Sequence, residues 1–199
     1  MKTAAITMMM LLANAAARPQ AIPNLDERKV AVCLERGAID PGKAWVARTI
    51  ASEIFAKIGV TVVWNDPHDC PATAIFISIS QKTPATLKPG ALAYALPYEG
   101  VHIRVFYDRI AQSSPLDNVP VVLGYVLVHE MTHILEGISR HSESGVMKAH
   151  WDKTDFFAMR RNSLRFAEED IRLIFVGLEG RSHASILALN RKPVAVAAR

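Results

Sequence analysis

The sequence predicts a single α/β (α+β) domain built on a mixed β-sheet. Short runs rich in β-branched residues alternate with a helical segment between residues 29 and 80, in the order strand, helix, strand, strand. A long apolar helix follows at 119–135, and another helix at 163–177. The chain has 199 residues, 50% of them hydrophobic, which fits one domain with a full core. We place that domain at residues 30–178.

The N-terminal segment, residues 1–17, has the features of a secretory signal peptide. It carries a positive charge at Lys2, an apolar run from Ala4 to Leu12 and small alanines where cleavage occurs. An apolar run this short does not span a membrane as a mature helix. We therefore expect a secreted or periplasmic protein, with no stable membrane insertion after signal cleavage. Residues 18–29 are polar, contain prolines and are predicted to be a linker.

Charge and cysteine content narrow the possible partners. The formal net charge is +4 and the basic residues are scattered, which is typical of a solvated exterior. We expect no nucleic-acid partner. Cys33 and Cys70 are the only cysteines, and they do not form a C-x-x-C pair, which disfavours metal ligation. In an exported protein they can form a disulfide.

Three strands and one helix are expected in the first part of the domain. The strands, rich in residues that favour extended structure, are 29–34, 60–64 and 74–80. Asp40-Pro41-Gly42 opens the helix. Its apolar positions recur at helical spacing, at Val46, Ile50, Ile54 and Ile58. The loop at 65–71 contains a His68–Asp69 pair that we interpret as a surface turn.

Further elements surround the long central helix. After a loop at 82–90 we expect a short strand at 92–96, a second strand at 101–108, an irregular segment or short helix at 153–161, and the C-terminal helix at 163–177. Acidic residues lie in the first half of that last helix. The basic, proline-bearing tail at 179–199 is expected to be poorly ordered.

The helix at 119–135 is predicted to be buried at the centre of the domain. Asp117 and Asn118 are good N-cap residues, and Pro120 is tolerated in the first turn. The run that follows is apolar almost all round, which is typical of a buried helix. Gly137 suits the left-handed residue that ends a helix.

This helix carries His129-Glu130-Met131-Thr132-His133, an HExxH pattern. On a helix the two histidines stand one turn apart on one face, with Cβ atoms about 5–6 Å apart. Imidazoles at that spacing can hold one zinc ion. Glu130 points about 100° away, off the metal, and is placed to act as a general base on water. Polar groups buried in an apolar helix need partners, and a metal supplies them.

The residues that follow resemble a known family. The segment HExxHxxxGxxxHS…GVM is similar to the metzincin clan of zinc peptidases, and to its matrixins in particular, whose pattern is HExxHxxGxxH followed by a methionine turn. This chain has one more residue before Gly137 and one more before His141. The resemblance implies that His141 is the third zinc ligand, that Met147 is the turn methionine and that each chain binds one zinc ion.

Other residues compete with His141 for the third ligand position. His150 could reach the metal from the loop, and Glu168 or Glu169 would give a gluzincin type of site from a later helix. Glu136 lies on the same helix face, but about 10 Å along the axis from the first histidine, too far to share one ion with it. We expect Glu136 to support the ligands indirectly.

The resemblance extends to the strands before the central helix. The short strand takes the place of the matrixin G-x-L-A-H-A edge strand, which implies that Leu92, Ala93, Tyr94 and Ala95 bind the backbone of an extended substrate. Tyr94 stands where that family has a structural-zinc histidine, and the family's acidic calcium loops have no counterpart. One zinc ion and no calcium are therefore expected. The likeness of the C-terminal helix implies that Asp170 binds backbone beneath the methionine turn.

The resemblance implies a metzincin-like zincin domain. Its sheet would be mostly parallel with an antiparallel edge strand, and it would have a central active-site helix and a C-terminal helix. The implied function is a secreted zinc-dependent endopeptidase, in which zinc on His129, His133 and His141 activates water and Glu130 moves the proton. Trp151 could line a side-chain pocket.

Two alternatives to an endopeptidase stay open. A zinc amidase or peptidase that acts on cell-wall peptides fits export equally well. A zinc-stabilised binding protein without catalysis would not need Glu130, so the presence of this residue argues against it. The expected partner is a peptide or protein substrate, and the sequence does not determine the oligomeric state.

Overall fold

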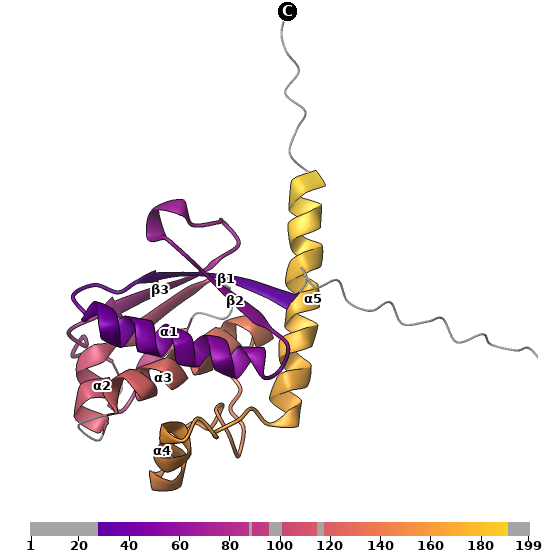
Figure 1. Ribbon diagram of the computed structural model, residues 1–199. Coiled ribbons are helices and arrows are strands. Elements are labelled where there is room, and N and C mark those ends of the chain that lie inside the picture. The colour runs from indigo at the N-terminus through magenta and orange to yellow at the C-terminus, as the bar shows by residue number, and fades with distance from the viewer. Residues whose placement is uncertain (1–27, 88, 96–100, 115–117, 191–199) are drawn as a thin grey trace, which may run out of the picture.

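Figure 1 shows the computed structural model of the chain, which describes residues 28–87, 89–95, 101–114 and 118–190. The predicted signal peptide at 1–17 and nearly all of the predicted linker at 18–29 lie outside the described residues. The elements in chain order are β1 (Lys29–Glu35), α1 (Pro41–Ala56), β2 (Thr61–Asn65), η2 (Pro67–Asp69), β3 (Ile75–Ser80), β4 (Ala93–Ala95), β5 (His102–Phe106), α2 (Tyr107–Ser113), α3 (Val119–Glu136), α4 (Lys153–Arg160) and α5 (Glu168–Asn190).

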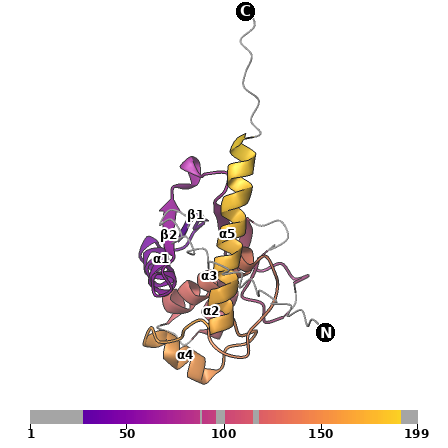
Figure 2. The same cartoon turned by 90° about the vertical axis from the view of Figure 1, so that its right-hand side faces the viewer.

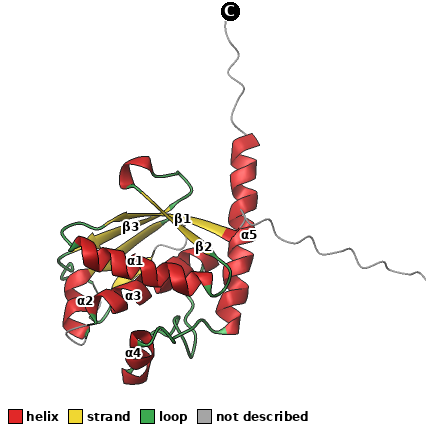
Figure 3. Ribbon diagram, in the orientation of Figure 1, coloured by secondary structure: helices red, strands yellow, loops and turns green. Residues whose placement is uncertain are grey.

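The five described strands form one sheet in the order β2-β1-β3-β5-β4 (Figure 3). Neighbouring strands pair in parallel, except that β4 pairs antiparallel with β5. The runs of valine and isoleucine in β1, β2 and β3 explain why these segments are extended. The structure therefore confirms the predicted mixed, mostly parallel sheet with an antiparallel edge strand.

Helices α1 and α3 pack against one face of this sheet (Figure 1). The strand residues that point to this face alternate along each strand and are buried: Val30, Val32, Ile75, Ile77, Ile79, Ile103 and Val105. In α3 every residue from Val122 to Leu135 is buried, as its apolar composition predicts. The helix with the HExxH pattern is therefore held rigidly at the centre of the domain.

Helix α5 runs along one side of the molecule and crosses the C-terminal end of α3 (Figure 2). Gly177 permits this contact, because a Cβ atom on it would lie 1.6 Å from the carbonyl oxygen of Leu135. No side chain fits in that space. The two helices therefore pack backbone to backbone at this point.

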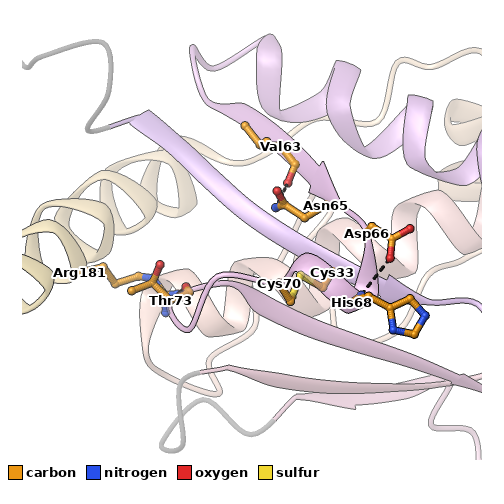
Figure 4. Close-up of a disulfide and its surroundings, with 8 residues drawn as sticks. All are labelled: Cys33, Val63, Asn65, Asp66, His68, Cys70, Thr73 and Arg181. Atoms are coloured by element: carbon orange, nitrogen blue, oxygen red, sulfur yellow. Dashed lines mark hydrogen bonds between the residues drawn. A yellow bond between two sulfur atoms is a disulfide. The ribbon is translucent and has the colours of Figure 1, made fainter.

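The opposite face of the sheet carries no long helix in the described part of the chain (Figure 3). The connection between β2 and β3 rises over it and contains the η2 turn, which Asp66 caps by accepting a hydrogen bond from the His68 N–H at 2.9 Å. A disulfide joins Cys33 of β1 to Cys70, with the Cα atoms 6.1 Å apart (Figure 4). The structure confirms both the predicted disulfide and the exposed turn at His68–Asp69.

The start of the C-terminal helix differs from the prediction. The sequence predicts a helix from residue 163, but α5 begins at Glu168. The carbonyl oxygen of Arg165 accepts a hydrogen bond from the Val146 N–H at 2.9 Å, which keeps residues 163–167 non-helical. Asp170 then accepts a hydrogen bond from the Ala167 N–H at 3.1 Å, which favours a helix start there.

The end of this helix also differs from the prediction. Residues 179–190, expected to belong to a poorly ordered tail, continue α5 to Asn190. The segment contains no proline before Pro193 and is rich in residues that tolerate a helix. Gly180 alone is not enough to stop it. Residues 191–199 lie outside the described residues.

Of the short helices α4 and α2, the sequence predicts only the first. A capping box between Asp152 and Asp155 starts α4, in agreement with the short helix expected at 153–161. The sequence did not predict α2, whose first residues Tyr107 and Asp108 were expected to end a strand. Asp108 accepts hydrogen bonds from the N–H and the hydroxyl of Thr83, at 3.0 and 2.7 Å, a pairing across 25 residues. Within the described residues, no helix combines the length and apolar composition needed to cross a membrane.

Candidate metal centre

Helix α3 brings the HExxH residues to a cavity beside the edge strand β4. Pro120 lies in the first turn, and Asn118 is the N-cap residue, although its side chain makes no capping hydrogen bond. The helix ends at Gly137, whose φ of 69° is left-handed and whose N–H donates to the His133 carbonyl oxygen at 3.0 Å. This turn ends the helix and starts the loop that brings the next histidine to the first two.

Three histidines converge in this cavity: His129 and His133 from α3, and His141 from the loop after it. Their ligating nitrogens lie within 4.8 Å of one another, and the Nε2 atoms of His129 and His133 are 3.1 Å apart. The His141 ring centroid lies 5.2 Å from that of His129 and 5.0 Å from that of His133. Three imidazoles at these separations are the donor set of a zinc site that keeps a fourth position open.

Backbone carbonyl groups orient the two helix imidazoles. Nδ1 of His129 lies 2.9 Å from the carbonyl oxygen of Val146, and Nδ1 of His133 lies 3.1 Å from that of Ile138. A carbonyl oxygen only accepts hydrogen bonds, so each Nδ1 carries the proton and each neutral ring turns a bare Nε2 toward the cavity. This is the tautomer in which imidazole binds a metal.

Burial keeps these two rings neutral. Burial first, and then the neighbouring histidines, lower the pKa of His129 to about 3 and that of His133 to about 4, although the hydrogen bonds to Val146 and Ile138 oppose this decrease. Burial also lowers the pKa of His141. Two Nε2 lone pairs therefore face each other at 3.1 Å without a proton between them. A divalent metal ion would relieve this repulsion, so the residues present fit the zinc ion that the sequence predicts.

Glu130 reaches the edge strand from a different side of α3. Its carboxylate lies in the cavity that is also lined by Ala95, the last residue of β4. Burial raises the pKa of Glu130 to about 8, and the Ala95 N–H partly offsets this increase. A cation in the same cavity would lower this pKa, because it favours the charged carboxylate. Glu130 and the strand expected to bind substrate therefore line the same cavity.

A buried aspartate anchors the loop that carries His141. Asp170 of α5 is fully buried and accepts hydrogen bonds from Arg140 at 2.6 Å and from the hydroxyl of Ser142. Both donors are direct neighbours of His141. The resemblance implied that Asp170 binds backbone beneath the methionine turn. Its carboxylate instead accepts from the backbone N–H of Ala167 and from the side chains of the histidine loop.

Met147 lies fully buried next to the metal cavity residues. Its carbonyl oxygen accepts a hydrogen bond from the Ser142 N–H at 2.8 Å, which closes the loop on itself. The preceding carbonyl oxygen, of Val146, accepts from Trp151 Nε1 at 3.1 Å as well as from His129. The turn therefore connects the methionine to the first histidine through one carbonyl group.

The cavity has a volume of about 680 Å³ and is lined by residues of both α3 and β4. The four expected substrate-binding residues Leu92, Ala93, Tyr94 and Ala95 line it together with the three histidines and Glu130. Trp151 lines it too, with its ring 5.6 Å from that of His129 and nearly perpendicular to it. The structure thus gathers all the sequence-predicted site residues except Met147 around one cavity.

The rival ligands are placed differently. His150 lines the cavity but is not among the three converging histidines. Glu169 pairs with Arg172 on the surface of α5, and Glu168 is exposed in the first turn of the same helix. Both carboxylate oxygens of Glu136 are buried without a hydrogen-bond partner in the described chain, and burial, then Asp170, raises its pKa to about 7.

Sequence reasoning missed the groups that orient the ligands. We expected Glu136 to orient the histidines, but the backbone carbonyl groups of Ile138 and Val146 do so. Every residue has a backbone carbonyl group, so the residue types do not indicate which of them bind a histidine. The anchoring by Arg140 and Ser142 had a weak signal, because polar residues flank His141 on both sides. Their common partner lies about 30 residues away along the chain, as the separation of Arg140 and Asp170 shows.

Comparisons with known proteins agree with this architecture. No family model matches the sequence, and no curated protein matches it. Among solved structures, the chain is similar to an archaemetzincin from Methanopyrus kandleri, with a TM-score of 0.54 and 14% sequence identity over 80% of this chain and 99% of that one. At this identity the likeness shows a shared fold. The predicted metzincin-like α/β fold is therefore confirmed.

Proposed function

We propose that this protein is a zinc-dependent metallopeptidase that hydrolyses peptide bonds in an extended substrate. The observation that carries the proposal is the convergence of three neutral imidazoles in a cavity that a buried carboxylate and an edge strand also line. The likeness in fold to an archaemetzincin supports it. Each part corresponds to a requirement of the reaction: a metal ligand set, a proton acceptor and a surface for the peptide backbone.

His129, His133 and His141 would hold one zinc ion per chain. Zinc bound to three histidines lowers the pKa of water and polarises a carbonyl group. The carbonyl oxygens of Val146 and Ile138 keep the two helix rings in the ligating tautomer before metal arrives. The ligand set needs little reorganisation, which favours tight binding.

Glu130 is the general base of the proposed reaction. It accepts the proton of the attacking water and passes it to the leaving amine, as a carboxylate with a pKa near neutrality can do in both directions. It lines the metal cavity together with Ala95, the last residue of the strand where the scissile peptide would lie. The peptide backbone would add to the outer edge of β4 by strand pairing.

We further propose that the protein acts in an oxidising compartment, either secreted or periplasmic. The disulfide between Cys33 and Cys70 supports this location, because such bonds persist outside the reducing cytosol. The partner is a peptide or protein substrate, and nucleic acid is not expected.

The proposal is tested by metal analysis and peptide hydrolysis on the purified chain. We expect one zinc per chain, and cleavage of casein or of an unstructured peptide that a chelator abolishes and added zinc restores. Glu130→Gln should keep zinc, because it is off the ligand set, and should lose cleavage, because an amide does not accept the proton. Full activity of Glu130→Gln, or protein that holds no zinc, would contradict the proposal.

A parallel arm uses cell-wall muropeptides as substrates. Cleavage of muropeptides without cleavage of casein would favour the amidase alternative within the same metal chemistry. Zinc binding without cleavage of either class would favour a zinc-stabilised binding protein.

A further inference from the structure

A second cavity, with a volume of about 1140 Å³, extends over the sheet face turned away from α1 and α3 and is also lined by Ala44 and Arg48 of α1. On this face four residues pair in register across the strands: Glu35 of β1, Ser78 of β3, Arg104 of β5 and Tyr94 of β4. We call these four residues the outer row. All four line the cavity. Tyr94 also lines the metal cavity. The edge strand is therefore the boundary between the two cavities.

The hydrogen-bond pattern of β4 determines how a peptide could add to its free edge. The Phe106 N–H donates to the Leu92 carbonyl oxygen at 2.8 Å. In an antiparallel pair the polar groups of successive residues alternate between the partner strand and the other side. The backbone N–H and carbonyl groups of Leu92 and Tyr94 thus point to β5, whereas those of Ala93 and Ala95 point to the free edge.

A peptide strand on that edge would bond to the outward groups and alternate its side chains between the two faces of the sheet. The substrate residue opposite Tyr94 places its side chain on the outer face, beside the Tyr94 ring. Its two neighbours face the metal cavity. One substrate side chain near the reacting bond is therefore exposed to a surface that the metal site does not include.

Positive charge dominates this surface near the edge. Arg104 is exposed, pairs in register with Tyr94 and makes no ion pair within the described residues. Arg109 lies 5.7 Å from the Phe106 ring, whose centroid is 5.9 Å from that of Tyr94, and its guanidinium donates to the carbonyl oxygen of Ala91 at 2.7 Å. Glu35 is the one acidic residue of the outer row, and Arg104 and Ser78 lie between it and Tyr94.

Distances along the sheet decide which charge the substrate side chain meets. Strands lie about 4.8 Å apart, so the added residue would be about 10 Å from Arg104 between Cα atoms and about 19 Å from Glu35. Extended arginine and glutamate side chains together span the shorter distance over the Tyr94 ring. They do not span the longer one. Asp66, the other acid lining the cavity, follows β2 at the far side of the sheet.

We infer that Tyr94 and Arg104 form a substrate subsite on the outer face that selects an acidic side chain in the residue paired with Tyr94. Tyr94 supplies the wall against which the side chain lies, and Arg104 supplies the charge. This inference rests on the proposed peptidase function, since it specifies the substrate of the same site. It makes Arg104 a specificity-determining residue that does not touch the metal.

The test uses a neutral peptide that the zinc-loaded protein cleaves, with glutamate, glutamine or lysine placed at each position in turn. At one position on the outer face, glutamate should raise kcat/KM over glutamine by about two- to five-fold, the range of an exposed ion pair, and lysine should lower it. The effect should weaken at high salt. Arg104→Gln should remove the preference, and Arg104→Glu should reverse it in favour of lysine.

Arg36→Gln is the matched control. Arg36 is also exposed and lines the same cavity, but it lies at the end of β1, far from the edge strand. This variant removes the same charge and should keep the glutamate preference. Thermal unfolding should give the parent Tm for the two Arg104 variants, because that side chain is exposed, and a slightly lower Tm for Arg36→Gln, which loses a hydrogen bond to the Ile39 carbonyl oxygen at 3.0 Å. These values check that the folds are intact.

Failure of the subsite and failure of the peptidase give different results. Cleavage with no charge preference at any position, or a preference that Arg104→Glu leaves unchanged, overturns the subsite and leaves the peptidase in place. If no peptide is cleaved, the proposed function fails, and binding of labelled Glu, Gln and Lys peptides to Glu130→Gln, measured by fluorescence anisotropy, tests the subsite directly. Equal binding of the three peptides would then overturn it.

Discussion

Replacing Asp170 by asparagine should weaken zinc binding although Asp170 is not a ligand. Asp170 is fully buried and holds both neighbours of His141, Arg140 at 2.6 Å and the hydroxyl of Ser142. Asparagine keeps the size of the side chain, but its amide has a single acceptor oxygen, so it can accept from Ser142 or from Ala167 and not from both. It loses the negative charge that Arg140 faces. The loop with the third histidine should then be held less firmly.

The magnitude follows from the burial of the pair. Removing one partner of a fully buried ion pair costs about 3–5 kcal/mol. The Arg140 side chain is 34% exposed, so water offsets part of the loss. We therefore expect a loss of unfolding free energy of about 2–3 kcal/mol, or about 4–12 °C in Tm for a chain of this size. Loss of a group that orients a ligand lowers metal affinity about 10- to 100-fold.

Two assays and one control measure these effects. Competition with a chromophoric chelator gives the zinc affinity, and thermal unfolding of the zinc-loaded protein gives Tm. Glu169→Gln is the control, because Glu169 precedes Asp170 in the same helix and pairs with Arg172 at 2.5 Å on the surface. That exposed pair contributes at most about 1 kcal/mol, and its loss should leave zinc affinity unchanged.

The combination of results decides whether Asp170 positions the loop. A lower Tm with unchanged zinc affinity would show that Asp170 stabilises the domain but not the ligand. Unchanged values for both would refute the reasoning entirely. Equal zinc loss in Glu169→Gln would instead point to Glu169 as a ligand.

Three further outcomes are expected. His141→Ala should lower zinc affinity strongly, whereas His150→Ala should retain zinc; the opposite result in the chelator assay would exchange their roles. Gly177→Ala should destabilise the fold by about 1–3 kcal/mol, because its Cβ would lie 1.6 Å from the Leu135 carbonyl oxygen. Gly180→Ala is the control and should stabilise α5 by up to about 1 kcal/mol, because a Cβ there would have no atom within 4 Å. Equal Tm values for the two variants would contradict this packing. Reduction of the disulfide, which joins residues 37 apart in sequence, should cost about 3–4 kcal/mol in denaturant unfolding, and an unchanged midpoint would contradict it.

The sequence predicted those parts of the site that lie within one element. A helical repeat fixes the relation between His129, Glu130 and His133, so five residues suffice to infer that two imidazoles share a face. The strands could be predicted equally well, because runs of valine and isoleucine favour extended structure. The edge strand and the third histidine came from resemblance to a family, since no local rule places either of them next to α3.

The parts that could not be predicted depend on distant contacts. Helix α5 starts late because the Arg165 carbonyl oxygen bonds to Val146, a residue nineteen positions earlier by number. Helix α2 begins where Asp108 bonds to Thr83. In both places the local sequence suits more than one conformation, and a long-range hydrogen bond decides between them.

The metal site and the loop after α3 depend on each other. The loop supplies the carbonyl oxygens of Ile138 and Val146, which set the tautomers of the two helix imidazoles. The same loop supplies His141. The helix histidines in turn satisfy these carbonyl groups, and Asp170 holds the loop from α5. One segment therefore prepares two ligands and contributes the third, so the order of this loop and the affinity for metal should change together in any variant.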